Sequence, residues 1–235
     1  MDELIVALDV DTRVDALALA SRLGQHTGAI KVGSQLFVSE GPDVVRELVA
    51  NGHRVFLDLK FHDIPNPVAG AVRAATRLGV WMLTVHATGG SRMLRAAAEA
   101  GTEEAHRLGR QPPLIVAVTV LTSLDADGLR DLGIAGDVPA SVARLASLAR
   151  EAGVHGVVAS PHELAPLRTS LGRDFVLVTP GIRPAGLPAA GDDQARAATP
   201  RDALAAGASY IVVGRPILRA TDPVAAARQI AADAR

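Results

Sequence analysis

The sequence predicts a (β/α)₈ barrel (TIM barrel), an α/β fold that takes in residues 1–235 as a single domain. Eight apolar segments of strand length recur along the chain, and segments with helical spacing separate them. The strand segments are rich in Val, Ile and Leu without strict polar alternation, which is typical of parallel strands covered on both faces. The length of 235 residues also suits such a barrel, which commonly needs about 200–250 residues.

The predicted strands and helices alternate along the chain. The strands cover residues 4–10, 29–32, 55–60, 82–86, 114–120, 156–160, 175–179 and 210–214. The helices cover residues 13–23, 42–50, 68–78, 92–108, 141–151, 161–171, 200–206 and 223–234. Left-handed glycines that end helices are expected at Gly24, Gly52, Gly79, Gly153, Gly172 and Gly207. Eight strand–helix repeats without a low-complexity linker favour a closed barrel over an open, doubly wound sheet.

The composition excludes several classes of function. The chain has 24 basic and 25 acidic side chains, a net charge of −1 and no cysteine. A nucleic-acid-binding protein would carry a basic face, and disulfides, thiolate nucleophiles and cysteine metal sites all need cysteine. The amino-terminal segment has neither the apolar region of a signal peptide nor the length of a membrane span. We therefore expect a cytoplasmic enzyme without nucleic-acid or membrane partners.

Polar side chains that follow the strands are the candidate functional residues, because the active site of such a barrel lies at the carboxyl ends of its strands. In chain order they are Asp9, Asp11, Lys31, Asp58, Lys60, Asp63, His86, Thr122, Ser160, Arg183 and Arg215. For Asp11 we prefer a structural role, as the cap of the helix that starts just after it. Asp125 and Asp127 are expected in a solvated turn.

The segment 58–67, Asp-Leu-Lys-Phe-His-Asp-Ile-Pro-Asn-Pro, is the most informative in the chain. Side chains of a strand alternate between its faces, so Asp58 and Lys60 are expected to point together toward the barrel axis. Lys31 and Asp9, on neighbouring strands, would extend this pair into an alternating array of charges. Flanking carboxylates favour the ammonium form of Lys60, which suits a proton donor to a basic carbanion better than a base or a Schiff-base former.

A structural ion-pair cluster that caps the barrel is the alternative interpretation of this array. An isolated Asp-x-Lys pattern supports both interpretations equally. Here, however, ionisable groups end three successive strands, Asp63 follows at once, and Arg183 and Arg215 come after the last two strands. This combination favours a site for a charged ligand.

The loops after the seventh and eighth strands commonly bind phosphate in these barrels. Arg183 follows Pro180-Gly181-Ile182, and Gly214 and Arg215 follow the last strand. A glycine N–H beside a guanidinium suits a phosphate dianion. Residues 184–199, rich in Gly, Ala and Pro, are expected to form a lid over the ligand. The separation of this end from the charge array suits a ligand of nucleotide size.

Taken together, these segments resemble the orotidine 5′-phosphate decarboxylase family, in order along essentially the whole chain. The resembling segments are Ala7-Leu8-Asp9, Lys31-Val32-Gly33, Asp58-Leu59-Lys60-Phe61-His62-Asp63-Ile64-Pro65-Asn66, Thr84-Val85-His86-Ala87, Thr119-Val120-Leu121-Thr122-Ser123, Pro180-Gly181-Ile182-Arg183 and Val213-Gly214-Arg215-Pro216-Ile217. The resemblance implies decarboxylation of orotidine 5′-monophosphate (OMP) to UMP, the last step of de novo pyrimidine nucleotide synthesis, with no metal and no cofactor. It also implies a homodimer with shared active sites.

The resemblance further implies roles for single residues. Lys60 would donate the proton to C6, and Asp58 would lie beside the substrate carboxylate. Lys31 and Asp9 would bind ribose hydroxyls and hold the array, while Asp63 would serve the active site of the neighbouring subunit. The other implied substrate-binding residues are Leu59, Phe61, His62, Ile64, Pro65, Asn66 and Pro67 in the strand-3 segment, Thr122 against the pyrimidine, Gln194 between phosphate and base, and Arg183, Gly214 and Arg215 at the phosphate.

Pro67 departs from the family pattern, in which a threonine usually follows Pro-Asn. A hydroxyl near the ribose of the neighbouring site is therefore expected to be missing. Proline is tolerated in a first helical turn, and Asn66 is expected to cap this helix. We expect the fold to survive, a ribose contact to weaken and activity to remain.

Two other functions stay open. The Mg²⁺-dependent sugar-phosphate lyases, such as hexulose-phosphate synthase and ketogulonate-phosphate decarboxylase, share the Asp-x-Lys-x-x-Asp signature. They place an acidic metal ligand where this chain has Lys31, whose ammonium would repel Mg²⁺. The other is a catalytically silent barrel that binds a phosphorylated ligand. The seven histidines form no His-x-His cluster, and we expect core or hydrogen-bonding roles for His62 and His86 rather than metal ligation.

Overall fold

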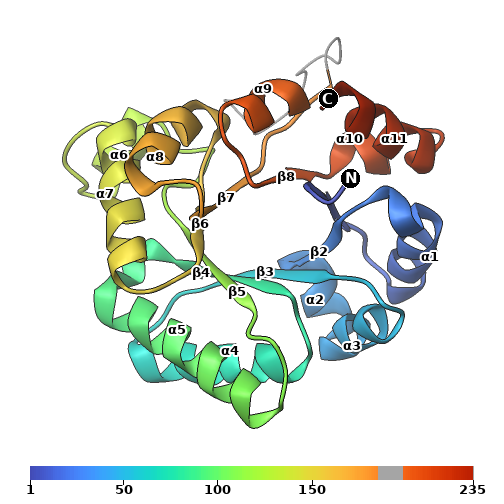
Figure 1. Cartoon of the computed structure of the whole chain (residues 1–235), viewed down its shortest axis with the longest axis horizontal. Coiled ribbons are helices and arrows are strands. Elements are labelled where there is room, and N and C mark those ends of the chain that lie inside the picture. The colour runs from blue at the N-terminus through green and yellow to red at the C-terminus, as the bar shows by residue number, and fades with distance from the viewer. Residues whose placement is uncertain (185–197, 235) are drawn as a thin grey trace.

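The structure is a computed structural model that describes residues 1–184 and 198–234. Parallel strands close into a barrel in the order β1 to β8, and β8 pairs back with β1 (Figure 1). The strands are β1 (Leu4–Ala7), β2 (Ala29–Gly33), β3 (Val55–Phe61), β4 (Met82–His86), β5 (Leu114–Val118), β6 (Gly156–Val158), β7 (Val176–Thr179) and β8 (Tyr210–Val213). The closed barrel confirms the fold that the strand pattern predicts.

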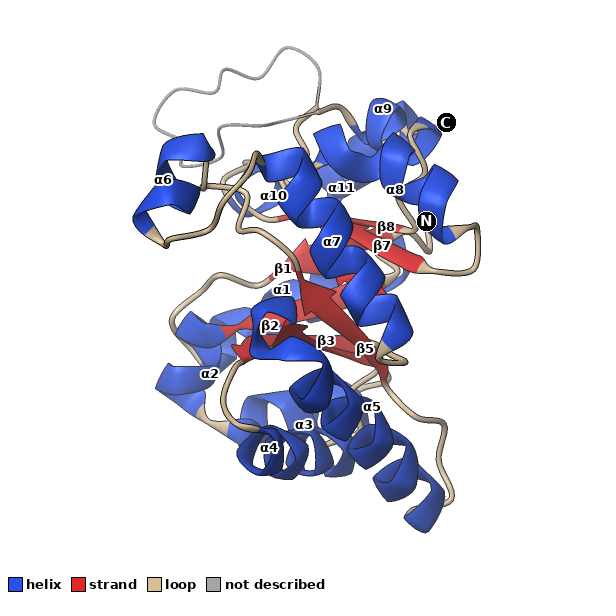
Figure 2. Cartoon of the chain, turned by 90° about the vertical axis from the view of Figure 1, so that its left-hand side faces the viewer, coloured by secondary structure: helices blue, strands red, loops and turns tan. Residues whose placement is uncertain are grey.

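Helices surround the barrel, as Figures 1 and 2 show. They are α1 (Arg13–Leu23), α2 (Ser34–Glu40), α3 (Pro42–Ala50), α4 (Pro65–Arg77), α5 (Gly90–Arg107), α6 (Ala126–Asp131), α7 (Val138–Glu151), α8 (Leu164–Leu171), α9 (Pro200–Ala205), α10 (Arg215–Leu218) and α11 (Pro223–Asp233). Within the described parts of the chain, no helix is long and apolar enough to cross a membrane. The six glycines expected after helices all have a positive φ, between 45° and 106°, as the sequence predicts.

The sequence pattern does not predict α2, α6 and α10. The last two have six and four residues, too few to show a helical period. Asp125 and Asp127, expected in a solvated turn, are exposed, but Asp125 is the N-cap of α6 and Asp127 lies in its first turn. The Asp125 carboxylate caps this helix by accepting hydrogen bonds from the N–H groups of Asp127 and Gly128, at 3.1 and 2.9 Å.

Two cap assignments made from the sequence are wrong. Thr12, not Asp11, caps α1, because its hydroxyl accepts the N–H of Asp15 at 3.1 Å. Asp11 instead accepts a hydrogen bond from Gln35. Helix α4 starts at Pro65, so Asn66 already lies inside the helix and is not its cap. Proline suits this first position because the first N–H of a helix has no partner within it.

The core has two layers, one inside the barrel and one between the barrel and the helices. The inner layer consists of Ile5, Ala7, Ala29, Phe56, Met82, Val116, Val178 and Val212. The outer layer is larger and includes Leu4, Leu57, Leu83 and Leu177 from strands that also contribute to the inner layer. Both strand faces are therefore buried, which explains why the strand segments read as continuous apolar runs.

Aromatic side chains pack at the amino ends of the strands, opposite the barrel mouth. Trp81 lies edge-on to Tyr210, with ring centroids 5.0 Å apart, and the Arg54 guanidinium stacks 3.9 Å from the Trp81 ring centroid. Trp81 is the only tryptophan of the chain. Its fluorescence is therefore a reporter of folding at the end of the barrel remote from the mouth.

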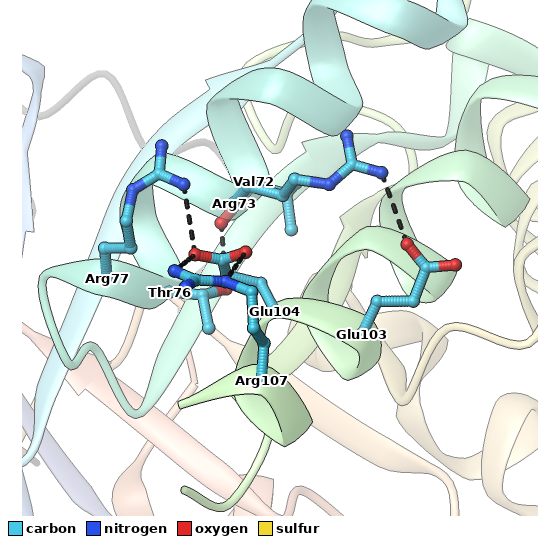
Figure 3. A network of polar contacts seen from close by, with 7 residues as sticks. All are labelled: Val72, Arg73, Thr76, Arg77, Glu103, Glu104 and Arg107. Carbon is cyan, nitrogen blue, oxygen red and sulfur yellow. Dashed lines mark hydrogen bonds and ion pairs between the residues drawn. The ribbon is translucent and has the colours of Figure 1, made fainter. Parts of the chain in front are cut away.

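Ion pairs join α4 to α5 on the outside of the barrel (Figure 3). The buried Glu104 carboxylate accepts hydrogen bonds from Arg77 at 3.0 Å and from Arg107 at 2.7 Å. Arg73 and Glu103 form a second pair at 3.3 Å. Hydrogen bonding from Arg107, followed by that from Arg77, lowers the pKa of Glu104 to about 2. Helix α4, which follows β3 directly, is thus anchored along its length.

Candidate active site

A cavity opens at the carboxyl ends of the strands. Its apolar walls come from the inner barrel layer and the adjoining loops, and comprise Ala7, Phe56, Val118, Val120, Leu121, Val158, Val178, Pro180 and Val212. Its other lining residues are Asp9, Lys31, Asp58, Lys60, Thr122, Gly181, Gly214 and Arg215. The fold therefore brings six of the eleven candidate residues, together with Gly214, from five different strand ends around one space.

The charged residues alternate in sign across this cavity. The ammonium of Lys31 lies 3.4 Å from Asp9 Oδ1 and 3.5 Å from Asp58 Oδ2. The ammonium of Lys60 lies 2.9 Å from the same oxygen of Asp58. The side chains of Lys31 and Asp58 are 12% exposed, against 38% for Lys60 and 48% for Asp9. Asp58 is thus the buried centre of the array, and the Lys60 ammonium faces the open cavity.

The charge state of Asp58 follows from competing effects. Burial by itself raises the pKa of its carboxyl, whereas the positive charges of Lys31 and Lys60 and the hydrogen bonds from Lys60 and Thr84 lower it. The net result is a pKa below the usual value, so the carboxylate is ionised at neutral pH. A ligand at the Lys60 ammonium would therefore meet a fixed negative charge beside it.

The β3 backbone departs from a regular strand at the array. Leu57 pairs with Leu83 and Phe61 with Val85, so three residues of β3 lie opposite Thr84 alone. Lys60, in this bulge, has a φ of 53° and is the only residue other than glycine with a positive φ in the described part of the chain. Asp58 and Lys60 do point to the same side, but the bulge, rather than the simple alternation assumed from sequence, directs Lys60.

The phosphate candidates divide into two groups. Gly214 and Arg215 line the cavity directly after β8. A Cβ on Gly214 would lie 3.3 Å from Asp9 Oδ2 and 3.4 Å from Ala7 Cβ, so glycine keeps this wall open. Arg183 does not line the cavity, and its guanidinium donates to the carbonyl of Ile182 at 2.9 Å. Gln194 and most of the expected lid, residues 185–197, lie outside the described residues.

The strand-3 segment does not enter the cavity beyond Lys60. Leu59 and Phe61 face the other way, into a second cavity between β3, α3 and α4. His62, Asp63, Ile64 and Pro65 line a surface depression together with Thr88, Gly89, Arg92 and Met93. Asn66 and Pro67 are exposed in the first turn of α4. Within one chain, these residues are therefore apart from the charge array.

The histidines near the mouth form a pair. The rings of His62 and His86 are 5.2 Å apart and tilted by 31°. Burial, followed by the nearby His62 and Lys60, lowers the pKa of His86, although Asp58 acts against this. In the described part of the chain, no three His, Asp or Glu side chains are grouped so that they could hold a metal ion.

Sequence reasoning assigned no role to Thr84, although Thr84 belongs to one of the family-like segments. Its hydroxyl is fully buried and contacts both Asp58 and the backbone of Lys60. The available signal was a hydroxyl residue within the apolar run Met-Leu-Thr-Val-His of β4. Gly33 was also missed as a neighbour of the array, since a Cβ there would lie 3.0 Å from Lys31 Nζ.

Known proteins resemble this chain over nearly its full length. The model of the orotidine 5′-phosphate decarboxylase / HUMPS family matches residues 2–230. A relative from Moorella thermoacetica, named orotidine 5′-phosphate decarboxylase, is 57% identical over 99% of this chain and 92% of its own length. A relative of the same name from Alkalilimnicola ehrlichii is 56% identical over 95% of this chain and 92% of its own. The crystal structure of orotidine 5′-phosphate decarboxylase from Lactobacillus acidophilus superposes with a TM-score of 0.87 at 40% identity, over 99% of this chain and 98% of that one.

Proposed function

Because the chain belongs to the orotidine 5′-phosphate decarboxylase / HUMPS family, we propose that it is a carboxy-lyase that converts OMP to UMP and CO₂. It would act without metal or cofactor, as one barrel domain in the cytoplasm, in the last step of de novo pyrimidine nucleotide synthesis. The observation that carries this proposal is the array itself. The ammonium of Lys31, in β2, is shared between the carboxylates of Asp9 and Asp58.

Lys60 and Asp58 carry the proposed chemistry. The bond from C6 to the carboxylate breaks, CO₂ leaves, and the electron pair stays on C6 as a carbanion. Lys60 Nζ then donates a proton to C6, and solvent reprotonates the amine through its exposed side. The ammonium also stabilises the carbanion while it forms, because it is held in place beforehand by Asp58 at 2.9 Å.

The rest of the cavity would bind the nucleotide. Lys31 and Asp9 have polar atoms for the ribose hydroxyls, and Thr122 would lie against the pyrimidine. Gly214 and Arg215, on the same wall of the cavity, would hold the phosphate. Arg183 and Gln194 remain proposed as further phosphate and base contacts.

A second subunit would complete the site. Asp63 and His62 are exposed and lie in a surface depression outside the cavity of their own chain. We propose a homodimer in which this surface, with Leu59, Phe61 and residues 64–67 around it, borders the partner's site and Asp63 joins the partner's array. Pro67 would leave one ribose contact unmade across this interface, with activity retained.

The direct test is to incubate the purified protein with OMP and to follow the loss of the orotate absorbance. We expect turnover in EDTA equal to that with added Mg²⁺, and a loss of at least about 10²-fold in kcat in Lys60→Ala. Turnover that requires Mg²⁺ would support a sugar-phosphate lyase of the same family instead. UMP binding without turnover of OMP would support a catalytically silent barrel.

The shared site has its own test. Lys60→Ala and Asp63→Asn proteins, each inactive alone, are mixed and allowed to exchange subunits. In a heterodimer one site carries both substitutions and the other carries none, so random exchange restores about a quarter of wild-type activity. An inactive mixture, with heterodimers detected by mass spectrometry, would refute the shared site and leave the decarboxylase proposal standing.

A further inference from the structure

We propose that Thr84 is a positioning residue for the reacting pair. Its hydroxyl joins the carboxylate of Asp58 to the backbone of Lys60 and thereby sets how the two groups face each other. Thr84 does not line the cavity, so it acts through these two residues and not on the substrate. This inference rests on the proposed function of the same site.

The direction of the two hydrogen bonds is fixed by chemistry. The N–H of Lys60 can only donate, so at 2.8 Å the Thr84 hydroxyl oxygen must accept from it. The Asp58 carboxylate can only accept, so the hydroxyl proton of Thr84 goes to Asp58 Oδ1 at 3.0 Å. Because Thr84 is fully buried, water does not replace either partner. One side chain thus satisfies both groups at once.

The bulge in β3 explains why the hydroxyl is needed. Residues 58–60 lie opposite Thr84 alone, so the N–H of Lys60 has no place in the regular ladder between β3 and β4. A buried N–H without a partner is unfavourable, and the left-handed backbone of Lys60 is itself strained. The Thr84 hydroxyl supplies the missing acceptor. It therefore supports the turn of backbone that brings the Lys60 ammonium back to Asp58.

The hydroxyl also fixes the rotation of the Asp58 carboxylate. Oδ1 is held by Thr84, whereas Oδ2 receives the ammonium of Lys60 at 2.9 Å and lies 3.5 Å from that of Lys31. Because both oxygens have partners, these contacts oppose rotation of the carboxylate about its bond to Cβ. The charged or titratable groups that face it are Lys31 on β2, Lys60 on its own strand and His86 on β4.

Packing alone does not require a hydroxyl at this position. Valine has the same branched shape and is favoured in strands, so Thr84→Val removes the two hydrogen bonds and little else. Thr84→Ser keeps the hydroxyl and removes only a methyl group. Thr76→Val is the matched control, because Thr76 is also buried and its hydroxyl donates to a backbone carbonyl, that of Val72 at 2.8 Å, on helix α4.

The test compares these variants in the decarboxylation of OMP. A misplacement of about 1 Å between reacting groups costs on the order of 10²-fold, so we expect Thr84→Val to lower kcat by roughly that factor. The KM for OMP and the affinity for UMP are expected to stay within about twofold, because the groups that bind the nucleotide are unchanged. Thr84→Ser is expected to restore most of kcat, and Thr76→Val to leave it at the wild-type level.

The pH profile separates positioning from a purely structural role. Thr84 stabilises the ionised carboxylate of Asp58, so its loss raises the pKa of Asp58 and moves the acid limb of kcat/KM to higher pH. Thr76→Val leaves that limb in place. An unchanged kcat and acid limb in folded Thr84→Val, or a loss in Thr84→Ser as deep as in Thr84→Val, would overturn the proposal.

Two further outcomes are decisive. If the wild-type protein does not convert OMP, the proposed function fails, and Thr84 is then judged by ¹³C NMR titration of the Asp58 carboxyl. An equal pKa of Asp58 in wild type and Thr84→Val would refute the inference on its own. If Trp81 fluorescence shows Thr84→Val unfolded, Thr84→Ala replaces it, and failure of both to fold would assign the hydroxyl to the fold instead.

Discussion

Replacing Lys60 by glycine or by alanine tests whether the backbone of the reacting strand is strained. Both substitutions remove the ammonium and its ion pair with Asp58, so the two variants differ only in the β carbon. Lys60 has a φ of 53°, a conformation that side chains with a β carbon rarely adopt. Glycine has no such restriction. We therefore expect Lys60→Gly to be the more stable of the two.

The size of the difference follows from two opposing effects. A left-handed backbone costs a residue with a β carbon about 1–2 kcal/mol. Glycine, however, has more conformational freedom in the unfolded chain, which lowers the stability of the glycine variant by about 0.4–1 kcal/mol. The free energy of unfolding of Lys60→Gly is thus expected to exceed that of Lys60→Ala by about 1 kcal/mol. For a chain of this length, that corresponds to a rise in Tm of about 2–4 °C.

The assay is urea unfolding followed by the fluorescence of Trp81, which lies at the opposite end of the barrel. Lys31 provides the control, because it lies in β2 without a positive φ. There Lys31→Gly is expected to be less stable than Lys31→Ala by about 0.5–1 kcal/mol. Equal stability of Lys60→Ala and Lys60→Gly would refute the proposed backbone strain. So would a stability difference between the glycine and alanine variants that has the same sign at positions 60 and 31. Both Lys60 variants are expected to lose at least 10²–10⁴-fold in kcat, the typical contribution of a positioned acid.

An acid titration and two other substitutions probe the scaffold and the array. The pKa of Glu104 is lowered from 4.5 to about 2. The ionised carboxylate therefore stabilises the folded protein above pH 4.5, and this contribution is lost as the pH falls toward 2. Measuring the free energy of unfolding as a function of acid pH would follow this loss. Arg168 donates to the carbonyls of residues 172, 173, 175 and 207, and Arg168→Met is expected to lower the free energy of unfolding by about 3 kcal/mol in urea. In Gly33→Ala, whose φ of −94° tolerates a side chain, the new Cβ would lie 3.0 Å from Lys31 Nζ and 3.6 Å from Asp9 Oδ1. Displacement of the ammonium is expected to lower kcat/KM for OMP roughly tenfold with little loss of stability.

Each of these expectations has a matched control. Glu104→Gln should flatten the acid dependence between pH 4.5 and 2, and an unaltered dependence would contradict the assigned pKa. Arg173→Met removes an exposed side chain from a residue whose backbone carbonyl Arg168 contacts, and it should leave the unfolding curve in place because that carbonyl remains. Gly70→Ala adds a methyl group where nothing lies within 4 Å and should leave kcat/KM unchanged. An equal effect of Gly33→Ala and Gly70→Ala on kcat/KM would show that the space at Gly33 does not matter to the charge array.

The local sequence was sufficient to predict the barrel and most of the charge array. Apolar runs of strand length, helical spacing between them and glycines at helix ends each reflect the conformation of a few consecutive residues. The closure of eight such units into a barrel then places every strand end at one mouth. Asp9, Lys31, Asp58 and Lys60 could therefore be assigned to one site, and the structure brings them within 3.5 Å of their neighbours.

Competition among neighbouring groups decided the helix caps. Thr12 and Asp11 both have the chemistry of a cap, and adjacent positions cannot both hold the first turn of α1. The structure places Asp11 within reach of Gln35, on α2, and leaves the cap to Thr12. Helix α6 is too short to leave a period in the sequence, and the Asp125 carboxylate stabilises it by accepting hydrogen bonds from the N–H groups of its first turn.

The geometry of the reacting pair was decided by tertiary structure alone. The sequence determined that Asp58 and Lys60 lie at the end of one strand, because that depends on residues adjacent in the chain. The bulge of β3, the left-handed backbone of Lys60 and the hydroxyl bridge from Thr84 depend on the register between β3 and β4, whose bonded residues are 24 and 26 positions apart. Register is set when the barrel closes and packs both faces of each strand, and no local pattern contains that constraint.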